Sequence, residues 1–191
     1  MKKLLLSLLI GFTAITCFAQ EHLTFKGIPI DGSLSKFAGE LRLKGFKYSG
    51  ETQGYPFFKG SFAGMKDCLV IVLYDDNGVY EVLASSNGYS SWDVVKAQYN
   101  KLKEALGDKY YVINCIEEFE DPYSEGDGME YWALKENKCH WGTNYMNFVG
   151  TISMNIGVIA SNNFFINIMY SDIENSNKAK ASIDKEIESD L

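Results

Sequence analysis

Two histidines and four cysteines are the side chains of this chain best suited to bind a metal ion or to act as a base and a nucleophile. His140 directly follows Cys139, whereas His22 and Cys115 lie far from that pair in the sequence. Zinc sites use closely spaced pairs of ligands, and many serine hydrolases carry a G-x-S-x-G turn; the chain has neither pattern. We therefore expect no metal site, no cofactor and no nucleophilic catalysis, and we interpret His140 as a structural residue.

Acidic side chains offer a second kind of chemistry, and they gather in three places: Glu117, Glu118 and Glu120; Asp121, Glu125 and Asp127; Asp75 and Asp76 next to Asn77. Two facing carboxylates can hydrolyse a glycoside, and a twelve-residue loop with acidic residues at alternate positions can bind calcium. The spacing here fits no calcium loop, and the sequence indicates no cleft for a carboxylate pair. We interpret these groups as solvated turns and surface residues.

Aromatic residues make up 14% of the chain, enough to form a binding surface as well as a core. Four of them fall on two neighbouring predicted strands, 129–135 and 138–148: Tyr131, Trp132, Trp141 and Tyr145. If two of them share the uncovered face of a sheet, they form a platform for a sugar ring or for an apolar anchor of a partner. The alternative is that they pack beneath the helices, as large aromatic residues usually do.

The first 19 residues have the pattern of a secretory signal peptide. Lys2 and Lys3 precede an apolar run that is too short to span a bilayer. We place the cleavage after Ala19, and the alternative is a lipid anchor on Cys17. The exported chain, residues 20–191, then has 16 basic and 25 acidic residues and a net charge of −9, which disfavours nucleic acid as a partner. No later apolar stretch is long enough to be a transmembrane helix.

Three cysteines remain after this cleavage, and an odd number allows at most one internal disulfide. Cys115 and Cys139 fall on predicted strands, and we predict that they pair in an oxidising compartment. Closing that loop would stabilise the fold by about 3 kcal/mol in the chain-entropy model. Cys68 begins an apolar run, so we expect it to be a buried thiol.

The clearest structural pattern is a predicted helix within residues 89–110. Its apolar residues recur at spacings of three and four, as on the buried face of an α-helix: Trp92, Val95, Tyr99, Leu102 and Leu106. Ser90 is the expected N-cap, and Gly107 is the expected left-handed residue just past the end. A second, shorter helix is predicted between Ser33 and Gly45.

Strands are predicted on both sides of the longer helix: 23–30, 57–63, 68–74 and 79–84 before it, and 111–119, 129–135, 138–148, 151–159 and 164–170 after it. Residues 68–74 are apolar at every position, which predicts a strand inside the sheet that is covered on both faces. Asn77 and Gly78 predict a type I′ hairpin turn. Residues 173–191 predict a helix with a thin apolar stripe.

This order of elements predicts an α+β fold, an antiparallel sheet with helices packed on one face. The motif of a helix followed by strands occurs twice, which indicates a degenerate tandem repeat. We expect one compact domain over residues 20–191. It would comprise repeat halves at 23–88 and 89–171 and a tail helix at 173–191.

Four segments resemble a family of uncharacterised secreted proteins of Bacteroidetes-type gut bacteria: TFKGIPIDGSL (24–34), KGSFAGMKDC (59–68), GTISMNI (150–156) and FFINIMYSDIEN (164–175). These are turn and strand residues, so the resemblance implies a shared fold and export and brings no catalytic residue. On architecture alone, the chain is also similar to the helix-plus-four-strand repeats of the β-lactamase-inhibitor-like fold. Members of that fold bind proteins or belong to cell-envelope complexes.

These expectations favour a secreted, non-enzymatic binding module that acts through the uncovered face of its sheet on an envelope protein or a glycan. Two other classes stay open: a cell-envelope enzyme of unrecognised type that acts on glycans, and a purely structural envelope component. Exposed Trp132 or Trp141 in a shallow concavity would favour binding. A deep pocket with convergent carboxylates would favour an enzyme.

Overall fold

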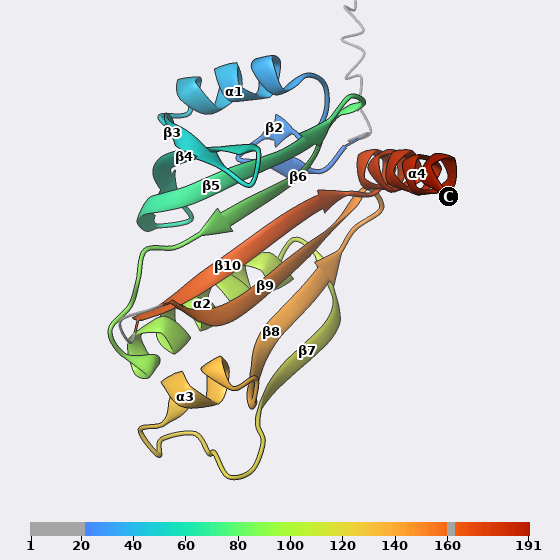
Figure 1. Ribbon diagram of the computed structural model, residues 1–191. Helices are drawn as coiled ribbons and strands as arrows, with labels where there is room; N and C mark the ends of the chain where they lie inside the picture. Colours follow the sequence, from blue (N-terminus) through green and yellow to red (C-terminus); the bar gives the residue numbers. More distant parts are fainter. Residues whose placement is uncertain (1–21, 160–162) are drawn as a thin grey trace, which may run out of the picture.

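The computed structural model of the protein describes residues 22–159 and 163–191, and Figure 1 shows its elements. In chain order they are β1 (Thr24–Phe25), β2 (Ile28–Pro29), α1 (Leu34–Leu43), β3 (Lys47–Thr52), β4 (Tyr55–Phe62), β5 (Met65–Asp75), β6 (Gly78–Ser85), α2 (Trp92–Gly107), β7 (Tyr111–Phe119), α3 (Glu130–Lys135), β8 (Cys139–Met146), β9 (Gly150–Ile159), β10 (Asn163–Asp172) and α4 (Ile173–Asp190). The predicted leader and Cys17 lie outside the described residues.

An eight-stranded antiparallel sheet forms the body of the protein, with the strand order β3-β4-β5-β6-β10-β9-β8-β7. The order reflects two similar halves. In each half a helix precedes four strands, α1 before β3 to β6 and α2 before β7 to β10, and the last strands of the two halves, β6 and β10, pair at the centre. The predicted α+β fold with an antiparallel sheet and a tandem helix-plus-strands repeat is therefore confirmed.

Helix α2 lies across one face of β8, β9 and β10 (Figure 1). It buries the five predicted residues: Trp92, Val95, Tyr99, Leu102 and Leu106. The predicted caps are wrong, because Ser91 and not Ser90 is the N-cap, and Gly107 is the last helical residue. Asp108 follows it in a right-handed conformation, with φ −67°. Packing of the apolar face therefore holds this helix without the caps that its sequence suggested.

The first half covers the same side of the sheet with α1 and the small β1-β2 hairpin. Ser33 caps α1 as predicted, and Phe37 and Leu41 are buried. The predicted strand at 23–30 is instead this hairpin, which turns at Lys26 and Gly27, both with positive φ. The Phe25 ring packs edge-to-face against Tyr170 at 5.5 Å, so the hairpin joins the core beneath the helices.

The predicted hairpin between β5 and β6 is present, but its turn is not of the predicted type. A type I′ turn needs positive φ at both central residues. Here Asp75 pairs with Gly78, so the central residues are Asp76 and Asn77, and neither has a positive φ. The carboxylate of Asp75 accepts the Asn77 backbone N–H at 2.8 Å, and this contact stabilises a different two-residue turn.

Residues 129–135 were predicted to be a strand, and this prediction is wrong because they contain the helix α3. Tyr131 and Trp132 favour strands by propensity. The buried residues are Glu130 and Ala133, three apart, which is a helical spacing. Asn137 then takes a positive φ of 57° and leads the chain into β8.

Helices α1 and α2 and the β1-β2 hairpin do not pack on the second face of the sheet. The burial of alternate residues along β5 shows the difference between the two faces. Val70 and Val72 are fully buried beneath the helical layer. Leu69, Ile71 and Leu73 point to the opposite face and are only half-buried. The prediction that this strand lies inside the sheet is confirmed, and the prediction that both its faces are covered is wrong.

The tail helix α4 begins where β10 ends and projects beyond the sheet (Figure 1). Asp172 caps it by accepting the Asn175 N–H at 3.0 Å. Ala179 is buried, whereas Ile183 and Ile187 are exposed. Among the residues that the structure describes, no helix is both long and apolar enough to cross a bilayer.

Candidate functional site

The four aromatic residues predicted to form a binding platform lie apart, in two pairs. Trp141 and Tyr145 are on β8, and both are buried on the side covered by α2. Trp141 packs edge-to-face on Trp92 at 5.1 Å, and the Tyr145 hydroxyl donates to the Lys103 carbonyl at 3.2 Å. These two side chains are therefore core residues beneath α2, which is the alternative that the sequence left open.

Tyr131 and Trp132 lie on α3, not on a strand next to β8. Tyr131 packs against Phe164, a core residue, with ring centroids 6.3 Å apart. Trp132 is 42% exposed, and Lys135 lies over its ring at 4.6 Å. The structure therefore places no member of the predicted platform on the uncovered face of the sheet.

The predicted disulfide between Cys115 and Cys139 is wrong, because the strand register separates the two residues. Cys115 pairs with Thr143 and Cys139 pairs with Phe119, an offset of four residues on each strand. Four residues extend about 13 Å along a strand, beyond the roughly 7 Å that a disulfide can bridge. All three described cysteines are free thiols. Burial raises the pKa of Cys139 to about 12 and also raises that of Cys68, which is buried as predicted.

The carboxylates on β7 do not form a catalytic pair. Glu117 and Glu118 are neighbours on a strand and therefore point to opposite faces. Glu117 forms an ion pair with Lys103 of α2 at 2.5 Å. Glu120 accepts from Lys138 at 2.7 Å and contacts His140 at 3.0 Å, and these hydrogen bonds hold its pKa below the ordinary value.

The acidic loop and the hairpin tip use their carboxylates to build turns. Asp127 accepts the backbone N–H groups of Ser124 at 2.8 Å and Met129 at 2.7 Å, which lowers its pKa. Asp75 binds Asn77 through both of its oxygens. Within residues 22–159 and 163–191, no three His, Cys, Asp or Glu side chains converge on a possible metal position.

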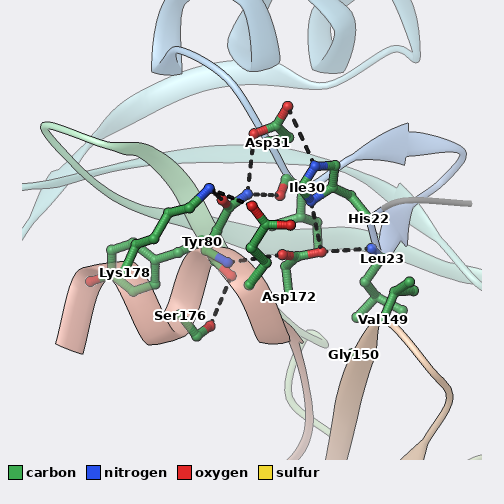
Figure 2. A network of polar contacts seen from close by, with 12 residues as sticks. His22, Leu23, Ile30, Asp31, Tyr80, Val149, Gly150, Asp172, Ser176 and Lys178 are labelled. Atoms are coloured by element: carbon green, nitrogen blue, oxygen red, sulfur yellow. Dashed lines mark hydrogen bonds and ion pairs between the residues drawn. The ribbon is translucent and has the colours of Figure 1, made fainter. Parts of the chain in front are cut away.

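A buried polar network surrounds Asp172, as Figure 2 shows. Its carboxylate accepts the backbone N–H of Leu23 at 2.8 Å, and His22 Nδ1 lies 3.2 Å from the same oxygen without hydrogen-bond geometry. Asn175 donates to the Ile30 carbonyl at 2.9 Å. The groups of this network bind backbone atoms and one another, so we interpret it as a structural link between the segment around the β1-β2 hairpin and α4.

The uncovered sheet face carries a continuous row of apolar side chains that the sequence analysis did not single out. Strand register places Phe57, Ile71, Leu83 and Met169 side by side across β4, β5, β6 and β10. All four are only half-buried. The Phe57 ring lies over Gly50 of β3, where an added Cβ would come within 3.1 Å of it. The row is therefore a partly exposed apolar patch that spans four of the eight strands.

The same row continues into the second half of the sheet with polar residues. Met169 pairs with Ser153, which pairs with Asn144, which in turn pairs with Asn114. A groove of about 480 Å³ lies here, and its lining includes Asn155 and the two glycines Gly142 and Gly157. Amide side chains can donate and accept hydrogen bonds at once, so this half can bind hydroxyl or peptide groups.

Phe165 joins the two halves of this face. It pairs with Gly157 across β9 and β10, and its ring occupies the space that a side chain at Gly157 would fill. Like Phe57, it is half-buried and faces away from α2. These two phenylalanines, and not the predicted tryptophans and tyrosines, are therefore the aromatic residues that the strand register places on this part of the uncovered face.

One signal in the sequence pointed to this surface. Residues 68–74 are apolar at every position, yet a strand covered by helices on one face needs apolar residues only at every second position. The excess falls on Leu69, Ile71 and Leu73, on the uncovered face. Comparison of the chain with protein-family models, curated proteins and solved structures finds no match.

Proposed function

We propose that the chain is an exported, non-enzymatic binding module that takes a partner protein on the uncovered face of its sheet. The observation that carries this proposal is the half-buried row of Phe57, Ile71, Leu83 and Met169. Such a contiguous apolar surface is typical of a protein interaction site. The signal-peptide pattern of residues 1–19 supports an exported location.

The composition of the face supports a protein partner. Protein interfaces combine an apolar centre with a polar rim that supplies hydrogen bonds. On this face the apolar row is flanked by Ser85 and Asn167 on the neighbouring row and by Ser153 and Asn144 farther along the sheet. A glycan would use the amide groove alone and leave the apolar row exposed, so a protein accounts for more of the surface.

Paired substitutions on the face test this proposal. Ile71→Thr with Leu83→Thr removes two apolar contacts, while β-branched threonine remains suited to a strand. The matched control is Val94→Thr, an apolar-to-threonine change at a 55% exposed position on α2. We would use the wild type and both variants as baits in native envelope extract, and then measure affinity with the purified partner.

The expected result is a partner that binds the wild type and the control equally and binds the face variant at least roughly tenfold more weakly, as for the loss of interface anchors. Hydrogen exchange of the complex should show protection of β5, β6 and β10 side by side. Equal affinity of all three baits, or protection confined to the helical side, would overturn the proposal. Capture of glycan alone, with loss of binding on Asn144→Ala, would favour the glycan alternative.

A further inference from the structure

A second hollow lies apart from the apolar row, between the β5-β6 hairpin tip and helix α4. It has a volume of about 390 Å³, and three tyrosines line it: Tyr55, Tyr74 and Tyr80. The hairpin tip is fastened to the helix, because Asn77 donates to the Ser182 hydroxyl at 3.0 Å. The hollow is therefore bounded by strands on one side and by α4 on the other.

The three tyrosines hold one another in place. The Tyr55 and Tyr74 rings pack edge-to-face with centroids 6.2 Å apart and an interplanar angle of 83°. The hydroxyl oxygens of Tyr55 and Tyr80 lie 3.3 Å apart and share a hydrogen bond. All three side chains are half-buried. The rings are thus largely ordered before any ligand arrives, which lowers the entropic cost of binding.

The hollow carries negative charge without compensation. Its lining includes Asp75, Asp76 and Glu186 and contains no Lys, Arg or His. Asp75 is occupied by Asn77, whereas Asp76 and Glu186 form no ion pair with the described residues. Burial foremost, then the hydrogen bond that Tyr80 shares with Tyr55 and the nearby carboxylates Glu81 and Asp75, raises the pKa of Tyr80.

We propose that this hollow binds a small organic ammonium cation. A cation is attracted to the faces of aromatic rings, and quaternary ammonium groups in particular are recognised by groups of aromatic side chains. Asp76 and Glu186 supply the opposite charge at the rim, whereas an anion would be repelled. The same chemistry could come from a quaternary head group or from a primary amine such as a lysine side chain.

Three probes distinguish the effect of ligand charge from that of ligand shape, and a quaternary head group from a primary amine. Choline and 3,3-dimethylbutan-1-ol have nearly the same shape, and only choline is charged; n-butylammonium represents a primary amine. We would titrate each into the full exported chain and follow tyrosine ring signals by NMR. Saturable binding of choline or n-butylammonium, with no binding of the neutral alcohol, is the expected result. The stronger of the two cations identifies the source.

Variants locate the binding. Tyr74→Leu should weaken cation binding roughly fivefold by removing one ring face, and Asp76→Asn with Glu186→Gln should weaken it by a similar factor and reduce its salt dependence. Tyr80→Phe keeps the ring and should leave affinity within about twofold. Tyr48→Leu, at an exposed tyrosine outside the hollow, is the matched control and should change nothing.

Three outcomes would overturn the proposal. They are equal binding of choline and the neutral alcohol, no saturable binding of either cation, and unchanged affinity in both the Tyr74→Leu and the double carboxylate variants. The carboxylate variant changes two exposed side chains, so it folds even if the tyrosine variant does not, and the test remains decisive.

Discussion

Asp172 is a fully buried carboxylate that holds two distant parts of the chain together. Its two oxygens accept the Leu23 N–H and the Asn175 N–H, so it caps α4 and secures the segment that leads into β1. A buried carboxylate is stable only when such donors replace the water that it has lost. The contact with Asn175, three residues away, is local, but the tertiary link is the contact with Leu23, which lies 149 residues away in the sequence. Sequence reasoning could not find this role because no local pattern indicates so distant a partner.

We predict that Asp172→Asn lowers the free energy of unfolding by about 2 kcal/mol, and Asp172→Ala by about 3 kcal/mol. Asparagine can still cap the helix, but its amide group presents a donor where the carboxylate accepted one from Leu23. Urea unfolding followed by circular dichroism measures the change. Asp184→Asn, at an exposed position on α4, should cost less than about 0.5 kcal/mol. Equal losses at the two positions would contradict the role given to Asp172.

Helix α2 shows which information a segment carries by itself. Its buried face could be predicted completely because a period of 3.6 residues is a local property of the sequence. The caps could not, because packing of Trp92 and Leu106 decides where the helix begins and ends. The segment of Tyr131 and Trp132 is the opposite case, since local propensity favours a strand and the tertiary environment selects α3.

Faces of strands were predictable only in part. Alternation shows that Trp141 and Tyr145 of β8 point to the same side, but it does not say which side the helices cover. That choice depends on contacts with α2, about forty residues earlier in the chain. For the same reason the sequence predicted the wrong residues for the candidate site, which the structure places at the row of Phe57, Ile71, Leu83 and Met169.

Glu125 joins the acidic loop to the start of α2. It forms an ion pair with Lys96 and accepts the indole N–H of Trp92 at 3.2 Å. The hydrogen bond from Lys96 is the largest effect on the pKa of Glu125 and lowers it below the ordinary value of 4.5. Burial acts in the opposite direction and is smaller, and the hydrogen bond from Trp92 lowers the pKa further. A carboxyl group whose pKa is lower in the folded state adds stability above the ordinary value and loses it as the pH falls through the folded value.

We therefore predict that Glu125→Gln destabilises the protein at about pH 6, and that this difference from the wild type shrinks as the pH falls below 4.5 and through the lowered pKa of Glu125 in the folded state. The Glu125 side chain is 42% exposed, so solvent screens the ion pair and the effect at neutral pH is small. Guanidinium unfolding at a series of pH values measures it. Glu118→Gln, which removes an exposed carboxylate that forms no ion pair within residues 22–159 and 163–191, is the control and should show no such convergence. A difference that grows on acidification would contradict the sign.

At the scale of the molecule, the two halves meet at β6 and β10, which leaves β3 and β7 as the edges of the sheet. The edges differ. β3 contains four lysine, serine, glutamate or threonine residues and a single aromatic residue, Tyr48, a composition that discourages pairing with another chain. β7 instead exposes Tyr111, Val112 and Ile113 next to a row of unpaired backbone groups.

An exposed apolar edge strand favours pairing with a second copy. The acidic residues of β7, Glu117 and Glu118, lie at its end, so an antiparallel pairing keeps the acids of the two copies apart and a parallel one would place them together. We therefore predict concentration-dependent association through β7. Because the net charge of −7 opposes it, added salt should strengthen the association.

Ile113→Lys should weaken this association roughly tenfold or more, since it places a charge within the exposed apolar segment Tyr111, Val112 and Ile113 of the edge. Sedimentation velocity over a concentration series measures the change. The control is Val94→Lys on α2, because the two native side chains are 54% and 55% exposed and the substitutions add the same charge. If both variants associate as the wild type does, or if both lose association equally, β7 is not the contact. A selective loss in Ile113→Lys would leave the uncovered face of each copy free to bind its partner, since that face and the β7 edge are different surfaces of the same sheet.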